Sequence, residues 1–277
     1  MDLFVFGTLR CGTLRKIVLG RDISSDDICR ATIKDFRVYW AKEGPFPVMI
    51  PEPNSEALGL VLKNLSEPDV ERLNYYELGF DYVLAPTFVE THAGQIQVSA
   101  YFCNRSDMAT SKLWSFDDWL SDHSEIQYLA AREFLDFFGT KFGDTAQVMY
   151  NSILKRAEVF VTVNSTPTRA LEIGPEINKS IQVEDLKREY LGFFALNQVD
   201  LKYPFFDNSI SGLKSRTILM GSEASLILPY DPILDKVLLV EQFRIGPFCR
   251  GDKAPWVYEP VAGMIEFGEK PFSSAAA

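Results

Sequence analysis

Hydrophobic and polar positions alternate in short runs over the first hundred residues, a pattern that is typical of β-strands. A helical stretch is expected to end near Gly20, and a second helix is expected to begin after Ser66, whose side chain suits an N-terminal cap. This part of the chain is therefore predicted to form a small β-rich domain with two helices. The strand-like runs are Leu3–Phe6, Ala31–Ala41, Ala57–Lys63, Val83–Glu90 and Gln95–Phe102.

The pattern changes after Ser106, where apolar residues recur at helical spacing over about 112–160 and predict two or three helices. These helices either close the first domain or connect it to the next one. A polar stretch with turn signals follows, and strand-like runs resume near Tyr190. The predicted organisation is a first domain at 1–110, a helical bridge at 111–163, a linker at 164–185 and a second domain at 186–277.

Composition narrows the classes of function. The chain has 277 residues and a net charge of -10, which argues against a nucleic-acid or anionic-membrane partner, since both need a concentrated positive surface. A small anionic ligand stays compatible, because a few local arginines override the overall field. The four cysteines lie far apart without zinc-type spacing, and no apolar run reaches the length of a membrane span. We therefore expect a cytoplasmic protein without a membrane segment.

A motif near the end of the chain, WVYEPVAGMIEFGEKPFSSAA, separates Gly263 from Glu269 by five residues. This spacing resembles the first half of a Nudix box, in which a glycine turns the loop tightly and a following helix aligns carboxylates that hold Mg²⁺. Together with SRT, EASLILPYDP and KVLLVEQFRIGPF, it resembles the ADP-ribose pyrophosphatase branch of the Nudix hydrolases over about 190–276.

That resemblance implies roles for five residues. Arg216 and Arg244 would contact the adenosine or diphosphate groups, and the Ala262 carbonyl would bind the metal just before Gly263 of the box. Glu269 would support the loop and the metal shell. The helix that carries the main metal ligands in the family is missing, so the chain is expected to be a fragment whose remaining ligands lie beyond its end.

The activity implied for the full-length gene product is Mg²⁺-dependent hydrolysis of ADP-ribose, or a related nucleoside diphosphate, to AMP and ribose 5-phosphate. This chain alone is expected to be inactive in that reaction, because it lacks the catalytic helix.

Three motifs near the start, FVFGTLRCG, PFPVMIPEP and LNYYELGFDY, resemble the γ-glutamylcyclotransferase-like fold, including its plant AIG2-like members, over about 3–105. The resemblance implies that the loop of Gly7, Thr8 and Leu9 presents backbone N–H groups to a carboxylate or amide oxygen of the substrate. It also implies that Glu77 acts as the base when a γ-glutamyl amine closes to 5-oxoproline.

Glu77 sits in the sequence among Tyr75, Tyr76, Phe80 and Tyr82, and apolar walls raise the pKa of a carboxyl towards the range useful to a base. If chemistry occurs there, Glu77 should face the Gly7–Leu9 loop across a pocket. The alternative is that Glu77 is a polar residue at a helix end and that the domain is a non-catalytic module for ligand sensing or scaffolding.

The fold class expected for the whole chain is α+β: a small γ-glutamylcyclotransferase-like mixed β-barrel, a helical bridge and an incomplete Nudix α/β/α sandwich. Such fusions resemble bacterial Nudix proteins. The expected partners are small molecules, not nucleic acid or membrane. The oligomeric state stays open, with a homodimer as one expected assembly because related hydrolases pair through N-terminal strands.

Overall fold

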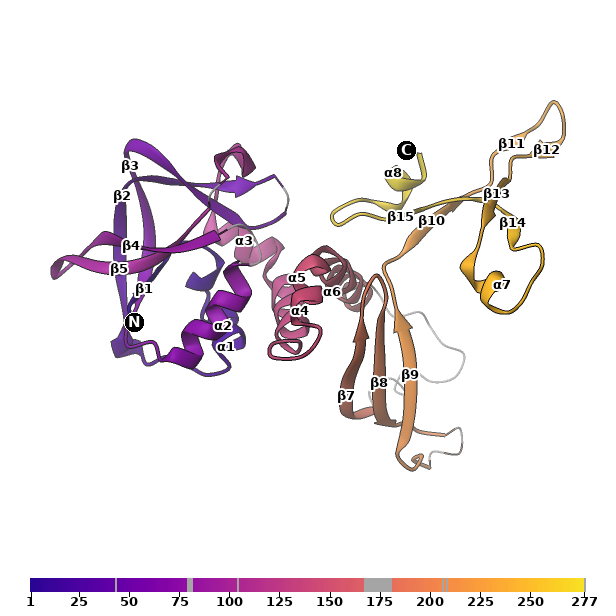
Figure 1. Cartoon of the computed structure of the whole chain (residues 1–277), viewed down its shortest axis with the longest axis horizontal. Coiled ribbons are helices and arrows are strands. Elements are labelled where there is room, and N and C mark those ends of the chain that lie inside the picture. The colour runs from indigo at the N-terminus through magenta and orange to yellow at the C-terminus, as the bar shows by residue number, and fades with distance from the viewer. Residues whose placement is uncertain are drawn as a thin grey trace. The chain divides into compact units, whose positions relative to one another are not determined.

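The chain folds as a mixture of helices and strands, which confirms the α+β class (Figure 1). Contacts divide it into two compact units, Met1–Leu219 and Met220–Ala277. The computed structural model describes residues 1–42, 44–78, 82–103, 105–166, 181–205, 207 and 209–276, apart from the side chain of residue 106.

Five strands of the first unit close into a barrel. Around the ring, β3 pairs with β1, β1 with β5, β5 with β4, β4 with β2, and β2 with β3 again. The β1–β5 pair is parallel and the others are antiparallel, so the predicted small mixed barrel is confirmed. A sixth strand, β6 (Ala109–Leu113), pairs with β2 outside the ring. The five strands are β1 (Leu3–Val5), β2 (Ile28–Ala41), β3 (Pro47–Leu62), β4 (Tyr82–Thr91) and β5 (Gly94–Cys103).

The shortest of the five barrel strands, β1, closes the ring and is buried along its whole length. Its backbone approaches β3 closely at Gly59, where an added Cβ would lie 2.5 Å from both the Phe4 ring and the carbonyl oxygen of Val5. Only glycine fits there without displacing β1. The barrel core contains Phe4, Phe6, Ala31, Ile33, Met49, Ala57, Val61, Val89, Val98 and Ala100.

The β2–β3 hairpin includes most of the proline-rich motif PFPVMIPEP, residues 45–53. That segment and the strand expected at Ala57–Lys63 form one continuous strand. The pairing register shifts between Lys34 and Phe36, next to Asp35, whose φ of 60° bends the strand. Asn54, with φ 64°, donates its N–H to the Asp35 carboxylate at 2.9 Å. Of the prolines in β3, Pro47 begins the strand, Pro51 pairs with Phe36 at the shift, and Pro53 lies within the interrupted stretch.

Two helices pack beside the barrel at the predicted places. Helix α1 (Gly12–Leu19) ends at Gly20, which takes a left-handed φ of 75°. Helix α2 (Glu67–Glu77) begins after Ser66, and Ser66 and Asp69 form a reciprocal capping box.

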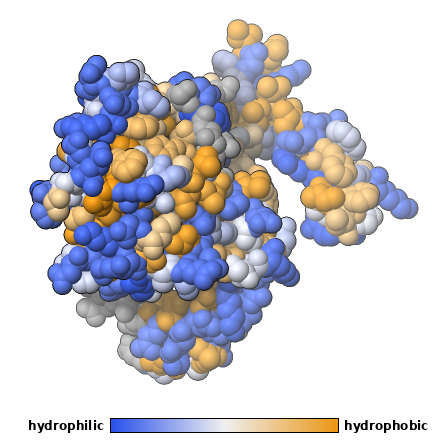
Figure 2. Space-filling model, turned by 60° about the vertical axis from the view of Figure 1, so that its left-hand side comes forward, coloured by the Kyte–Doolittle hydropathy of each residue, from blue (hydrophilic) through white to orange (hydrophobic). Residues whose placement is uncertain are grey.

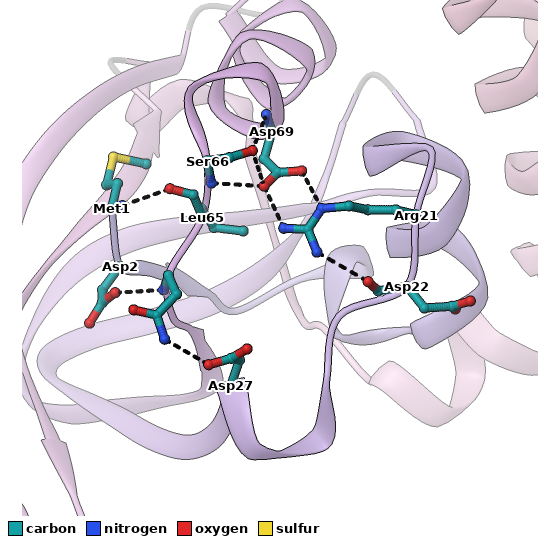
Figure 3. A network of polar contacts seen from close by, with 9 residues as sticks. Met1, Asp2, Arg21, Asp22, Asp27, Leu65, Ser66 and Asp69 are labelled. Carbon is teal, nitrogen blue, oxygen red and sulfur yellow. Dashed lines mark hydrogen bonds and ion pairs between the residues drawn. The ribbon is translucent and has the colours of Figure 1, made fainter.

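The cap of α2 is joined to α1 by a charged side chain (Figure 3). Arg21 donates to both carboxylate oxygens of Asp69, at 2.8 and 2.5 Å. This guanidinium, with additional hydrogen bonds from Ser66, lowers the pKa of Asp69 to about 2. The contact fixes the start of α2, and therefore the position of Glu77 at its end.

Four helices occupy the stretch where two or three were predicted: α3 (Phe116–Asp122), α4 (Ser124–Leu135), α5 (Gly143–Val148) and α6 (Tyr150–Ser165). Helix α4 packs against both α1 and α6. The α4–α6 contact includes a nearly buried ion pair between Glu133 and Arg156. The helices therefore belong to the same packed body as the barrel.

Most of the predicted linker, 167–180, lies outside the described residues. An antiparallel sheet of β7 (Gln182–Leu191), β8 (Ala195–Lys202) and β9 (Lys214–Met220) follows it. Arg188 of β7 donates to Asp136 at 2.8 Å and lies 3.9 Å from Glu133. These contacts attach the sheet to the end of α4.

The second unit contains short antiparallel strand pairs and two short helices. Large hydrophobic side chains stay exposed in it, including Ile233 at 92% and Phe272 at 86%. The predicted Nudix sandwich is not established by this arrangement and stays a prediction. The elements are β10 (Ala224–Ile227), β11 (Tyr230–Asp231), β12 (Lys236–Val237), β13 (Val240–Phe243), α7 (Ile245–Cys249), β14 (Trp256–Glu259), β15 (Val261–Met264) and α8 (Pro271–Ala276).

The surface of the protein mixes hydrophobic and hydrophilic residues, and orange areas lie among blue ones on the face drawn in Figure 2. Among the described helices, none is both long and apolar enough to cross a membrane.

Replacing Asp69 by alanine should lower the free energy of unfolding by about 1–2 kcal/mol, because α2 loses its cap and Arg21 loses its partner. Urea unfolding followed by tryptophan fluorescence measures this, since Trp40, Trp114 and Trp119 all belong to the first unit. Asp22→Ala is the matched control, because the Asp22–Lys16 ion pair is exposed and should contribute little.

The loss of stability caused by Asp69→Ala should depend on pH. The folded pKa of Asp69 is lowered to about 2, so its stabilisation is complete above the ordinary aspartate pKa and is lost as the pH falls through about 2. The stability difference between wild type and Asp69→Ala should therefore shrink in acid. Equal stabilities of the two proteins at pH 7 would contradict this account.

Candidate active site

A cavity of about 80 Å³ lies where the end of β1, the end of α2 and the barrel meet. It brings together the four residues predicted for the γ-glutamyl site. Gly7, Thr8, Leu9 and Glu77 all line it, so Glu77 and the loop share one pocket, as expected if chemistry occurs there. The other lining residues are Phe4, Val5, Phe6, Phe46, Pro47, Tyr76, Tyr82, Tyr101, Gln127 and Tyr150.

The loop after β1 owes its shape to close packing at Gly7. A Cβ added there would lie 2.4 Å from Cγ of Pro47, so no other residue fits without moving the loop or β3. A single turn of 3₁₀ helix (Thr8–Arg10) follows. The N–H groups of Thr8 and Leu9 donate to no acceptor in the described part of the chain, as is normal at a helix start.

An arginine holds the other side of this loop. One guanidinium nitrogen of Arg15, from α1, donates to the carbonyl oxygens of Leu9 at 3.0 Å and Arg10 at 2.7 Å. The Thr8 and Leu9 N–H groups share their peptide planes with the carbonyls of Gly7 and Thr8. These carbonyls accept from the Arg10 N–H at 3.0 Å and the Cys11 N–H at 2.9 Å, which limits how the two peptides rotate. The loop therefore presents its N–H groups on a constrained backbone.

Glu77 is the last residue of α2 and keeps a small exposed surface because it lines the cavity. Its carboxyl makes no hydrogen bond with the described residues and is enclosed by protein atoms. This burial raises the pKa of Glu77 to about 7. A carboxyl with that pKa exchanges a proton readily at neutral pH, as a general base requires.

Four tyrosines surround the Glu77 carboxyl. Burial raises the pKa of Tyr150 to about 12, and it also raises the pKa values of Tyr76, Tyr82 and Tyr101, with the Glu77 charge adding to the effect in all four. The phenols therefore stay neutral at physiological pH. No lysine, arginine or histidine is among the described lining residues.

Sequence reasoning identified Tyr76 and Tyr82 as walls around Glu77 but missed three polar lining residues. Tyr101 comes from β5, Gln127 from α4 and Tyr150 from α6. A helical pattern gave no signal that the last two would reach the barrel, because their spacing is that of ordinary core positions. Phe80, also expected near Glu77, lies outside the described residues.

The predicted Nudix residues lie on several elements of the two units. Arg216 is in the first unit on β9, where it donates to the neighbouring Ser215 carbonyl at 2.9 Å. Arg244, in the second unit, forms a two-point ion pair with Glu259. Their roles in binding stay predictions.

The remaining box residues lie together along the chain. Ala262 and Gly263 sit in β15, paired with β10. The Glu269 carboxylate accepts the Glu266 N–H at 3.0 Å, a contact that supports the loop. Among the described residues, no group of three or more histidine, cysteine, aspartate or glutamate side chains could hold a metal ion. The Mg²⁺ site expected at these residues stays a prediction.

Two kinds of known protein are similar to this chain: ADP-ribose pyrophosphatases and AIG2-like proteins. The chain is 43% identical to an ADP-ribose pyrophosphatase of Haemophilus influenzae over 84 residues, covering 30% of this chain and 39% of that protein. An Escherichia coli ADP-ribose pyrophosphatase is 40% identical over 89 residues, 31% of this chain and 42% of that protein. The chain thus spans about two fifths of the length of these relatives.

Plant proteins align over a longer stretch. AIG2-like protein C of Arabidopsis thaliana is 24% identical over 137 residues, covering 49% of this chain and 78% of that protein. Among solved structures, a solution structure from Arabidopsis thaliana has a TM-score of 0.36 at 19% identity, covering 60% of this chain and 94% of that one. A γ-glutamyl cyclotransferase has a TM-score of 0.33 at 16% identity, covering 38% and 66%.

The assignment of the first domain rests on a family model. Residues 3–121 match the family described as "Gamma-glutamyl cyclotransferase, AIG2-like". This range contains all five barrel strands, the Gly7–Leu9 loop and Glu77. Residues 3–121 therefore form a γ-glutamyl cyclotransferase, AIG2-like domain.

Proposed function

We propose that this domain converts a γ-glutamyl amine or dipeptide into 5-oxoproline and a free amine, with Glu77 as the base. The observation that carries the proposal is that a buried carboxyl with a pKa of about 7 shares a cavity with the N–H groups of Thr8 and Leu9. A base and hydrogen-bond donors in one enclosed space are what an acyl transfer needs.

In the proposed reaction, Glu77 takes a proton from the substrate's α-ammonium group. The neutral α-amine then attacks the γ-carbonyl carbon and forms the ring C–N bond. The Thr8 and Leu9 N–H groups are suited to a substrate carboxylate or to the carbonyl oxygen as it gains negative charge. Glu77 returns this proton to the leaving nitrogen as the original amide C–N bond breaks. The ring nitrogen gives up a second proton, which the leaving amine takes up as it departs as an ammonium ion, so the two protons lost by the α-ammonium group are the two gained by the leaving nitrogen.

Glu77→Gln should abolish 5-oxoproline formation, with a loss of about 100-fold or more, because glutamine cannot accept the proton. Chromatography of reactions with a panel of γ-glutamyl amines and γ-glutamyl dipeptides measures the product. Glu71→Gln is the matched control, because Glu71 lies on the same helix and is exposed. Equal rates for Glu77→Gln and wild type would rule out Glu77 as the base.

The rate of the wild-type reaction should rise with pH. A base acts only when deprotonated, and the pKa of Glu77 is raised to about 7. The value of kcat/KM should therefore increase as the pH approaches 7 from below and level off above it. A profile that is already flat between pH 5 and 8 would disagree with this role.

The loop can be tested with a pair of glycine variants. Gly7→Ala should suppress turnover, because its new Cβ would overlap Pro47 and displace the loop N–H groups. Gly12→Ala should retain turnover, because its Cβ would lie 3.7 Å from the flexible end of Arg15. Melting temperatures show whether each variant is folded. Full activity in a folded Gly7→Ala protein would count against the loop.

A non-catalytic role is the rival for the same cavity. A ligand-sensing or scaffold module would be stabilised against heat by a γ-glutamyl compound without converting it. The panel of substrates therefore separates the two functions: product formation supports the enzyme, whereas a rise in melting temperature without product supports the module.

ADP-ribose hydrolysis is a second candidate, favoured by the 40–43% identity to ADP-ribose pyrophosphatases. We propose it for the native protein in whatever length the cell makes. Arg216 and Arg244 would bind the nucleotide, and Gly263 and Glu269 would shape the metal loop. Native protein supplied with ADP-ribose and Mg²⁺ should release AMP and ribose 5-phosphate, and chelation of Mg²⁺ should stop the release. Absence of AMP from intact native protein would refute the candidate.

A further inference from the structure

The tyrosine hydroxyls around Glu77 all have partners other than its carboxyl. Four phenols line the same cavity as Glu77, and a phenol O–H is a good donor to a carboxylate. No hydrogen bond joins any of them to Glu77 among the described residues. The hydrogen-bond partners of these hydroxyls therefore determine whether a phenol can donate to the Glu77 carboxyl.

Two of the hydroxyls donate to fixed oxygen atoms. Tyr82 donates to the carbonyl oxygen of Pro47 at 2.9 Å, and Tyr101 donates to the side-chain oxygen of Asn74 at 2.8 Å. Asn74 lies one helical turn before Glu77 on α2. Each of these two O–H groups therefore points to an oxygen atom other than those of Glu77.

The other two hydroxyls are joined by one amide. The side-chain nitrogen of Gln127 donates to the hydroxyl oxygens of Tyr76 at 2.8 Å and Tyr150 at 2.5 Å. Gln127 is 7% exposed, and the two hydroxyls also interact with each other. This cluster holds both phenol oxygens in place from α4, beyond the end of the residues that match the family model.

We propose that Asn74 and Gln127 are positioning residues: Asn74 directs the Tyr101 hydroxyl away from the Glu77 carboxyl, and Gln127 fixes where the Tyr76 and Tyr150 hydroxyl oxygens lie. Neither residue needs to touch the substrate. Asn74 accepts the Tyr101 proton, whereas Gln127 donates to the Tyr76 and Tyr150 oxygens and holds them where neither hydroxyl bonds the carboxylate among the described residues. A carboxylate with fewer donors is a stronger base. The inference rests on the proposed function, because the basicity of Glu77 matters to a reaction only if Glu77 is the base.

The titratable groups that surround Glu77 are tyrosines from four different elements. Tyr76 comes from α2, Tyr82 from β4, Tyr101 from β5 and Tyr150 from α6, and each feels the charge of Glu77. The lining residues of β1 carry no titratable side chain. Burial raises the pKa of Glu77, and no cation is among the described lining residues, so the tyrosine hydroxyls are donors that could lower it by turning to the carboxylate.

The test is a direct titration of Glu77 by NMR in protein labelled with ¹³C at the glutamate carboxyls. The Glu77 signal is assigned by its loss in Glu77→Gln. In Asn74→Ala, the freed Tyr101 hydroxyl should turn to the carboxylate and lower its midpoint by on the order of one pH unit. In Tyr101→Phe/Asn74→Ala, no donor remains to turn, so the midpoint should stay at the value of Tyr101→Phe alone.

Two outcomes of this cycle would overturn the role of Asn74: an unchanged midpoint in Asn74→Ala, or an equal fall with and without the Tyr101 hydroxyl. Asn74→Asp guards against loss of folding, because aspartate keeps an acceptor for Tyr101 and adds a negative charge. Its midpoint should not fall. A fall as large as that of Asn74→Ala would mean general disruption and would also overturn the proposal.

Gln127 is tested with its own matched control. Gln127→Leu should lower the Glu77 midpoint, because Tyr76 and Tyr150 lose the amide that holds them. Gln147→Leu should leave it unchanged, because Gln147 donates to the Tyr75 carbonyl and does not line the cavity. Equal midpoints in the two variants would overturn the role of Gln127. The titration needs no turnover, so failure to form 5-oxoproline would count against the proposed function alone.

Discussion

Closure of the barrel by one short strand is the constraint on which the rest of the first unit depends. The strand β1 has only three residues, yet it pairs with β3 on one side and β5 on the other. Its fit requires the absence of a side chain at Gly59, where the Phe4 ring takes the space. Because β1 is paired on both sides, the direction in which the chain leaves this strand is fixed. The turn at Gly7 is pressed against Pro47 of the neighbouring strand, and the loop donors reach the cavity as a result.

The cavity is a joint product of barrel and helices. The family match ends at residue 121, but Gln127 and Tyr150 lie beyond it and still line the pocket. The buried pair of Glu133 and Arg156 joins the two helices that carry them. A boundary drawn where the family match ends would therefore cut through the candidate site. The segment expected to act as a bridge between domains also supplies part of the wall around Glu77.

Local signals in the sequence predicted those features that depend on neighbours along the chain. The stop at Gly20, the cap at Ser66 and the alternating strands needed only helix-end chemistry and side-chain period. Glu77 and its loop came from family resemblance, which the residues alone could not supply. Gln127 and Tyr150 escaped prediction because their contacts join helices to a barrel far away in sequence. The single long strand β3 was missed because prolines usually end strands, whereas here bends at Asp35 and Asn54 accommodate them.

The three-stranded sheet that follows the helices is open, whereas the barrel is closed. A closed ring pairs both sides of every strand, but β7 pairs only with β8 in the described part of the chain. Its outer backbone groups are free to template another strand, which is how sheets aggregate. Charged residues, namely Glu184, Asp185, Lys187, Arg188 and Glu189, occupy half of that strand. They make docking of a further chain costly in dilute salt, so the tendency of this edge to add a strand should rise with ionic strength.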